Sequence, residues 1–207
     1  MSIDLTRTLQ SLATTRPVFH SERDFQFALA WQIQSEHAAA RVRLETRPSR
    51  SVHLDLLITL PDERVAFELK YFVDRSSIDY DGERFDLPNQ AAQPLSRYDF
   101  VKDIGRCESM IADGYADRAF AIALTNHRGY WNPGRKDESI DAAFKLHQGM
   151  ILAGTMQWSP ATGGTSKGRT DPLVVTGRYT CKWMPYSSIP GTPGKPIEFR
   201  YLAIEVT

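Results

Sequence analysis

The N-terminal part of the chain carries apolar residues at helical spacing. Residues 3–14 fit a short helix. A second helix begins after Ser21, whose hydroxyl suits an N-cap, and Asp24 stands where a capping-box acid belongs. Phe25 and Leu29 then follow at helical spacing. We therefore expect two helices before the first strand.

Alternation of apolar and polar residues replaces the helical period from residue 40 onward. Three segments alternate clearly and predict strands, at 40–47, 52–60 and 65–72. Leu54 and Leu56 are expected to share the core face of the second strand. The turn sequence PDER joins the last two strands as a hairpin.

The chain returns to a helix through a long polar segment. Residues 73–96 are rich in turn-forming residues and contain a candidate small hairpin at DYDGERF. Residues 97–113 fit a helix that ends before Gly114, and residues 118–126 fit a buried strand. The expected order over residues 20–126 is therefore α-β-β-β-α-β, which is typical of an α/β fold.

The last third of the chain predicts further strands and loops. Residues 139–149 fit a short helix, whereas residues 177–186 and 198–206 alternate as strands. The sequence has no internal repeat and no recognisable linker, so we expect one domain, 1–207. Beyond the core described above, residues 127–207 would add strands to the same sheet or cover its active face.

Three charged residues interrupt the apolar runs of the hairpin. Side chains alternate across a strand, so Glu68 and Lys70 point to the same face. If PDER is a four-residue loop, Leu60 pairs with Val65. That register sets Asp55 directly opposite Lys70, with Glu68 diagonal to it. The three charges would then converge on one small patch.

The simplest interpretation of this patch is an ion pair between Asp55 and Lys70 beside a solvated Glu68. Apolar residues share that face, however, and burying two carboxylates is costly unless positive charge compensates them. One lysine compensates only one carboxylate. A divalent cation would balance the second, and carboxylate oxygens completed by water suit Mg²⁺.

This hairpin resembles the signature of the PD-(D/E)xK, or restriction-endonuclease-like, nuclease superfamily. Asp55 is followed after twelve intervening residues by Glu68-Leu69-Lys70, which is similar to the aspartate, variable gap and E-x-K of that signature. Leu54 replaces the proline that often precedes the aspartate. The resemblance covers the core described above. It implies an αβββαβ core, with a mixed central sheet flanked by helices and with extra C-terminal strands and loops.

The resemblance implies a metal-dependent nuclease that hydrolyses phosphodiester bonds, with DNA as substrate and Mg²⁺ as cofactor, for which Mn²⁺ would substitute. Asp55, Glu68 and the backbone carbonyl of Leu69 would ligate the metal. Lys70 would orient or deprotonate the attacking water and stabilise charge on the phosphate. A neighbouring metal and partial burial give this lysine a reason for a lowered pKa. Endonuclease action is expected rather than exonuclease action, and a homodimer would suit cleavage of both strands.

Five further residues are candidates for supporting roles. Glu22 would point at the metal site from the preceding helix, or it is an acid favoured there by the helix dipole. Gln26, one turn later, would contact the site or a phosphate. His53 would touch nucleic acid or make a structural hydrogen bond. Lys102 and Arg106 would contact the phosphate backbone or form a solvated salt-bridge face.

Composition narrows the setting. The formal net charge is zero, so a nucleic-acid binder with this balance needs locally clustered Lys and Arg. Two cysteines, and no apolar run of about 20 residues, predict a reduced, cytoplasmic protein outside the membrane. No His or Cys spacing suits zinc, and no Gly-rich run suits a phosphate-binding loop.

Two other functions stay open from the sequence. The same core would also serve as a non-catalytic module that binds nucleic acid or protein, although such a module has no need of all three charges. An unrelated α/β protein with a fortuitous ion pair is the third interpretation. RNA remains an alternative substrate.

Overall fold

The computed structural model describes residues 2–49, 52–88, 92–134, 139–160, 165–191 and 195–207, which form a mixed α/β fold. The α-helices in these ranges are α1 (Leu5–Thr15), α2 (Glu22–Glu36) and α3 (Gln93–Ala112). The strands are β1 (Arg41–Ser49), β2 (Val52–Thr59), β3 (Arg64–Phe72), β4 (Ser76–Tyr80), β5 (Glu83–Leu87), β6 (Arg118–Thr125), β7 (Ile151–Met156), β8 (Leu173–Thr180), β9 (Trp183–Ile189) and β10 (Ile197–Val206). The expected order of helices and strands in the core is confirmed, with the β4–β5 hairpin inserted before α3.

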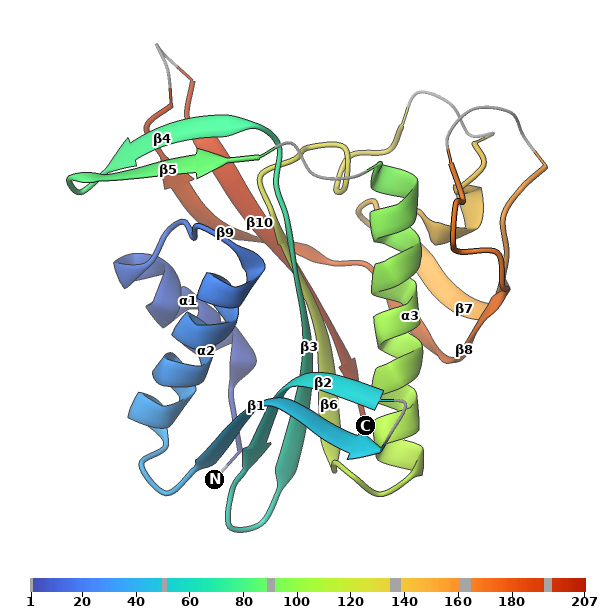
Figure 1. Ribbon diagram of the computed structural model, residues 1–207, viewed down its shortest axis with the longest axis horizontal. Helices are drawn as coiled ribbons and strands as arrows, with labels where there is room; N and C mark the ends of the chain where they lie inside the picture. The colour runs from blue at the N-terminus through green and yellow to red at the C-terminus, as the bar shows by residue number, and fades with distance from the viewer. Residues whose placement is uncertain (1, 50–51, 89–91, 135–138, 161–164, 192–194) are drawn as a thin grey trace.

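Six of the described strands form one mixed sheet, in the order β1-β2-β3-β6-β10-β9 (Figure 1). β3 and β6 run parallel, and the other neighbours run antiparallel. β4 pairs only with β5, and β7 only with β8, within the described ranges. Asp81 and Gly82 in the β4–β5 turn have φ angles of 50° and 77°, which suit a type I′ turn. The small hairpin predicted at DYDGERF is therefore confirmed.

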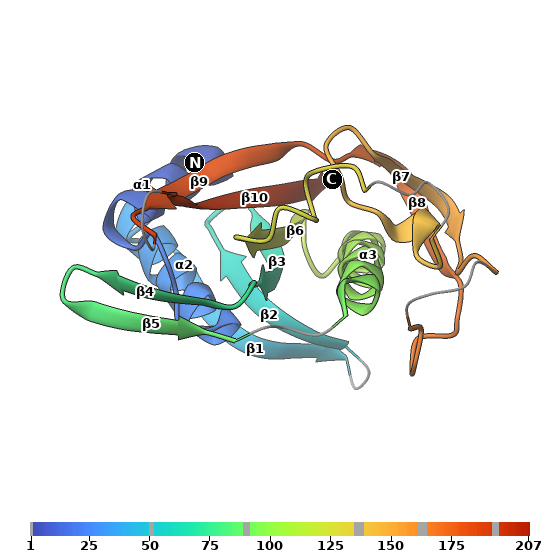
Figure 2. The same ribbon diagram turned by 90° about the horizontal axis from the view of Figure 1, so that it is seen from above.

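The helices cover opposite faces of this sheet (Figure 2). On one face, Phe25 and Leu29 of α2 are fully buried in a core cluster with Phe67 of β3. On the other face, Ile104 and Cys107 of α3 belong to a second cluster. α3 packs mainly against β3, β6, β10 and β8, and among the described elements β1 has no comparable contact with α3. None of the described helices is long and apolar enough to cross a membrane.

Alanines on β6 lie beside the charged positions of β3. The parallel register pairs Glu68 with Ala121 and Lys70 with Ala123, and Ala119 precedes them on the same face. All three alanines are fully buried in the cluster that α3 covers. Because they present only methyl groups, polar side chains of α3 can reach the charged residues of β3.

The β1–β2 hairpin bends at Glu45 and Asp55. Glu45 has a φ of 52°, in the left-handed region that residues other than glycine rarely adopt. Leu56 packs in the α2 cluster, whereas Leu54 packs in the α3 cluster. The prediction that Leu54 and Leu56 share one face is therefore wrong, because the alternation of side chains reverses at the bend.

The β2–β3 turn closes in a register that differs from the expected one. Thr59 pairs with Arg64, and the N–H of Leu60 donates to the carbonyl of Glu63 at 2.8 Å. The loop is therefore shifted one residue toward the N-terminus, and the predicted pairing of Leu60 with Val65 is wrong.

The C-terminal third departs most from the sequence-based expectation. The predicted strand 177–186 is wrong, because the chain leaves β8 and enters β9 of another sheet at Cys181. The N–H of Cys181 donates to the carbonyl of Met150, and its carbonyl accepts from Gly149, which fixes this break. Only a single 3₁₀ turn, Ala142–Phe144, forms within the helix predicted at 139–149. β7 has no counterpart in the prediction, whereas β10 agrees with it.

Candidate functional site

The candidate site lies where β2 leaves the edge of β3. The ladder between the two strands ends at Leu56, so the following N–H groups of β3 need other acceptors. Leu69 donates to Oδ2 of Asp55 at 2.7 Å, and Tyr71 donates to Oε2 of Glu22 at 2.9 Å. Two of the predicted carboxylates therefore act as hydrogen-bond partners of β3 in place of a strand.

Asp55 does not lie opposite Lys70, as the predicted register required. The last observed pair of the ladder is Leu56 with Phe67, so the next pair along the two strands would be Asp55 with Glu68. Two carboxylates directly opposite each other repel, and the strands separate at this row. Lys70 takes its partner from α3 instead.

Asp55 is also held by α2, which begins at the N-cap predicted at Ser21. Gln26 is buried, and its Nε2 donates to the backbone carbonyl of Asp55 at 2.5 Å, which fixes the bend of β2. Glu22, Gln26 and Asp55 line a cleft of about 560 Å³. Its other lining residues are His20, Ser21, Arg23, Glu45, Leu69, Tyr71, Val73 and Pro88.

Glu68 and Lys70 point from β3 toward α3. Nζ of Lys70 lies 2.8 Å from Oδ2 of Asp103. Arg106 also contacts Asp103, and its Nη2 lies 3.5 Å from Oε2 of Glu68. The side chains of Asp103 and Glu68 are only 1% and 2% exposed. Charged groups from a strand and a helix therefore form one buried network.

Burial controls the protonation of this network. It raises the pKa values of Glu22 and Asp55, and burial together with the nearby Asp103 raises the pKa of Glu68 to about 9. Burial alone would lower the pKa of Lys70, but Asp103, Glu22 and Asp55 outweigh that effect and raise it. The Lys70 pKa is therefore not lowered by burial as expected, because α3 adds a carboxylate, and the lowering by a bound metal stays a prediction.

The raised pKa of Glu68 predicts how stability depends on pH in metal-free buffer. The folded-state pKa of about 9 exceeds the ordinary 4.5, so the folded protein keeps a proton that the unfolded chain releases between these values. Relative to the Glu68→Gln variant, the wild-type free energy of unfolding should fall by up to about 1.4 kcal/mol for each pH unit gained in this window. Urea unfolding with EDTA at about pH 6 and about pH 8 measures this difference. Parallel pH profiles for the two proteins would contradict it.

The remaining predicted residues take different positions. Arg106 belongs to the buried network, so the salt-bridge alternative agrees with its contacts, although the network is not solvated. Lys102 is exposed on α3. His53 is exposed, with Nδ1 3.2 Å from Oε2 of Glu45. These two side chains therefore stand outside the network.

Asp103 is the residue of this network that sequence reasoning missed as a site residue. The sequence-based prediction names only Lys102 and Arg106 on this helix. Its position in the sequence could have indicated a buried carboxylate, because Asp103 lies between Phe100 and Cys107 on the apolar stripe of α3. A carboxylate at a position with that periodicity requires a buried cation, which Lys70 and Arg106 supply.

Comparisons with known proteins add no relative. No protein-family model, curated protein or solved structure matches this chain. Within the described ranges, no group of three or more His, Cys, Asp or Glu side chains is arranged to hold a metal ion. The geometry of the site is therefore the basis for inferring its chemistry.

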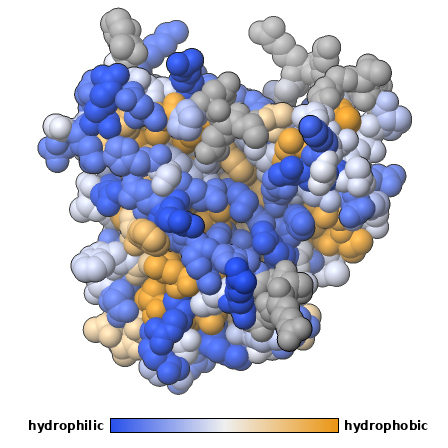
Figure 3. All heavy atoms as spheres, viewed as in Figure 1, coloured by the Kyte–Doolittle hydropathy of each residue, from blue (hydrophilic) through white to orange (hydrophobic). Residues whose placement is uncertain are grey.

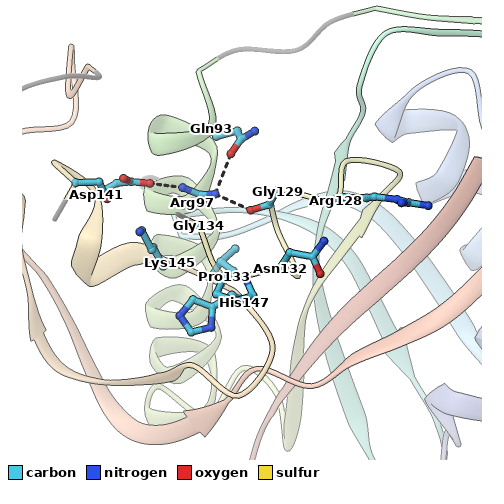
Figure 4. Close-up of a pocket in the computed structure, with 12 residues that line it drawn as sticks. Gln93, Arg97, Arg128, Gly129, Asn132, Pro133, Gly134, Asp141, Lys145 and His147 are labelled. Atoms are coloured by element: carbon cyan, nitrogen blue, oxygen red, sulfur yellow. Dashed lines mark hydrogen bonds and ion pairs between the residues drawn. The ribbon is translucent and has the colours of Figure 1, made fainter. Parts of the chain in front are cut away.

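A second cavity, of about 410 Å³, lies beside the first turns of α3 (Figure 4). Arg97 binds Asp141, and it donates to Oε1 of Gln93 and to the carbonyl of Gly129, each at 2.8 Å. Burial favours the neutral acid, but the hydrogen bond from Arg97 lowers the pKa of Asp141. These contacts tie α3 to the loop after β6, which is a structural role.

Proposed function

We propose that this protein is a metal-dependent nuclease that hydrolyses phosphodiester bonds in DNA. The observation that carries the proposal is the position of the Asp55 carboxylate, which accepts from Leu69 between Glu68 and Lys70 at the place where β2 leaves β3. The sequence marks these residues as one signature. Glu22 reaches the same edge of β3, and Asp103 holds Lys70 from α3.

The order of the elements supports a finer proposal for the fold, a restriction-endonuclease-like core. α2, β1, β2, β3, α3 and β6 follow one another in the order of that core, apart from the inserted β4–β5 hairpin. α3 connects the parallel strands β3 and β6, and β9 and β10 extend the same sheet. The charged signature thus stands on the elements that this core assigns to it.

The donor groups fit Mg²⁺ in type and in charge. Oε1 of Glu68 is buried without a hydrogen-bond partner among the described groups. The N–H of Leu69 donates to Asp55, so its carbonyl emerges at the same edge of the strand. Asp55, Glu68 and the Leu69 carbonyl would hold the ion, with water completing its coordination. When bound, such an ion polarises a phosphoryl oxygen and lowers the pKa of a bound water.

The balance of charge also supports a cation. The network and the adjoining carboxylates of Glu22 and Asp55 together contain twice as many carboxyl groups as cationic groups: Glu22, Asp55, Glu68 and Asp103 against Lys70 and Arg106. Burying that excess of negative charge is costly without a compensating ion. In the metal-free protein, the proton on Glu68 supplies part of the compensation.

Lys70 has the role of a fixed positive charge in this proposal. Its raised pKa keeps the ammonium group protonated near neutral pH, which favours stabilising charge on the phosphate over deprotonating water. Asp103 holds Nζ at 2.8 Å, so the position of α3 determines where the ammonium lies. Glu22 and Gln26 position the strand edge and the bend that carry Asp55.

A cleavage assay tests this function. The protein, stripped of metal with EDTA, is given Mg²⁺ or Mn²⁺ and incubated with duplex, single-stranded or branched DNA, with RNA, and with a closed circular plasmid. We expect cleavage that requires added metal, and nicking of the circle would identify an endonuclease. A double variant, Asp55→Asn with Glu68→Gln, purified in the same way, controls for contaminating nucleases.

Two results would refute the nuclease proposal. One is the absence of cleavage with either metal on every substrate, and the other is equal cleavage by the double variant. Tight binding of DNA without cleavage would instead favour the non-catalytic binding module on the same fold.

A further inference from the structure

We propose that four arginines on β1 and at the start of β3 bind the phosphates that flank the cleaved one. Arg41, Arg43 and Arg47 belong to β1, and Arg64 begins β3. We call them the arginine face. This inference rests on the proposed nuclease function and adds the surface along which the substrate backbone lies.

The register of the sheet places Arg41, Arg43 and Arg64 on one side, and Arg47, beyond the bend at Glu45, lines the same cavity as Arg64. Cross-strand partners share a face, and Arg41, Thr59 and Arg64 form one row across three strands. Arg43 and Leu57 are partners in the next row. Leu57 packs against the core cluster that α3 covers, so both rows project to the side of the sheet where α3 lies.

The same face leads directly to the candidate site. Alternate residues of a strand share a face, so Ala66, Glu68 and Lys70 follow Arg64 along β3. At about 3.3 Å per residue, Arg64 lies about 13 Å from Glu68 along the strand, and the row of Arg43 lies about 7 Å from it. A nucleic-acid backbone that reaches Lys70 along this face therefore passes the arginines first.

This face is open to a ligand. α3 packs mainly on β3, β6, β8 and β10, and β1 lies beyond these strands at the edge of the sheet (Figure 2). Arg41, Arg43 and Arg47 are exposed, and in the described part of the chain none of them pairs with a carboxylate. Arg64 donates to the carbonyl of Gly114 at 2.9 Å, and its Nε lies 3.7 Å from Oδ2 of Asp117, at the end of the face away from the site.

The surface beside Arg47 and Arg64 is hollowed. These two arginines line a cavity of about 220 Å³ whose other walls are mainly apolar: Thr46, Leu54, Leu57, Ala66, Met110, Tyr115 and Ala116. The arginine face therefore borders a concave surface. Figure 3 shows the molecule from the same side as Figure 1. Hydrophilic residues cover the middle of this surface, and hydrophobic residues occur in separate patches.

The bend in β1 separates opposite charges. Glu45, the acidic residue of this strand, has a positive φ and turns toward the α2 side, where it lies 3.8 Å from Arg23 and 3.2 Å from His53. Arg41 and Arg43 project to the other face. Because the whole chain has zero net charge, this local excess is the clustering that phosphate binding requires.

Salt-dependent binding tests the arginine face. A double variant, Arg41→Gln with Arg43→Gln, and the wild type are titrated with fluorescent duplex DNA in EDTA at several salt concentrations. We expect the slope of log K against log salt to become shallower by about 2, since each phosphate contact contributes about 0.9. The matched control replaces two exposed arginines elsewhere, Arg7 on α1 and Arg178 on β8, by glutamine, and its slope should equal that of the wild type.

Cleavage kinetics separate this proposal from the nuclease proposal. If the wild type cleaves DNA, the Arg41→Gln, Arg43→Gln variant should raise KM while kcat stays close to the wild-type value. Unchanged slope and unchanged KM would overturn the arginine face and leave the nuclease intact. A shallower slope in a protein that never cleaves would support the arginine face and overturn the nuclease.

Discussion

Replacing Lys70 with alanine is expected to lower the rate of Mg²⁺-dependent cleavage about 10²- to 10³-fold, the usual cost of removing one fixed stabiliser of developing charge. Its ammonium group is positioned by Asp103 and is protonated near neutral pH because nearby carboxylates raise its pKa. The rate should therefore fall by the same factor across about pH 6 to 9. Single-turnover cleavage over this range, with protein in excess of DNA, measures the loss.

The control for Lys70 is Lys182, an exposed lysine between β8 and β9. Its replacement by alanine should leave the rate unchanged. Lys70→Ala with a near-wild-type rate would remove lysine from the mechanism. A loss confined to high pH would assign Lys70 to deprotonating water, contrary to its raised pKa.

Replacing Asp103 with alanine is expected to lower the free energy of unfolding by about 3–5 kcal/mol, the usual cost of leaving buried cations without their partner. Asp103 is 1% exposed and contacts both Lys70 and Arg106. Its removal leaves Lys70 without its contacting carboxylate in a largely buried site, whereas Arg106 keeps Glu68 at 3.5 Å. Equilibrium unfolding in urea, in metal-free buffer, measures the loss.

Two further variants make the Asp103 result specific. Adding Lys70→Met to Asp103→Ala removes the cation that lost its partner and should restore part of the lost stability. Asp79 on β4 is exposed, and its replacement by alanine should change stability by less than about 0.5 kcal/mol. A loss below about 1 kcal/mol for Asp103→Ala would show that the network does not support the fold.

Local patterns in the sequence were sufficient to predict the elements that carry the site. Alternation located β2 and β3, and the cap at Ser21 located α2. Alternation along β3 places Glu68 and Lys70 on the same face. A turn shifted by one residue in both strands does not change which face each side chain occupies. The three signature residues were therefore identified correctly as neighbours.

The contacts between these residues depend on features that a linear pattern does not encode. The bend at Glu45 and Asp55 requires a φ of 52° at Glu45, which no residue preference in the sequence signals. The partner of Lys70 comes from Asp103, 33 positions later in the chain, and depends on how α3 packs across β3 and β6. Expecting Asp55 as the partner followed from considering the hairpin alone.

The alanines of β6 also determine the geometry of this site, through their small size. Ala121 and Ala123 carry no charge and make no hydrogen bond through their side chains, yet they lie beside Glu68 and Lys70 under α3. A larger side chain at either position would overfill the layer and push the helix outward. The carboxylate of Asp103 would then move away from Lys70 with every charged residue still in place. The size of the side chains on β6 thus determines the distance between Asp103 and the ammonium group of Lys70. A substitution there would change the geometry of the site without changing its charge.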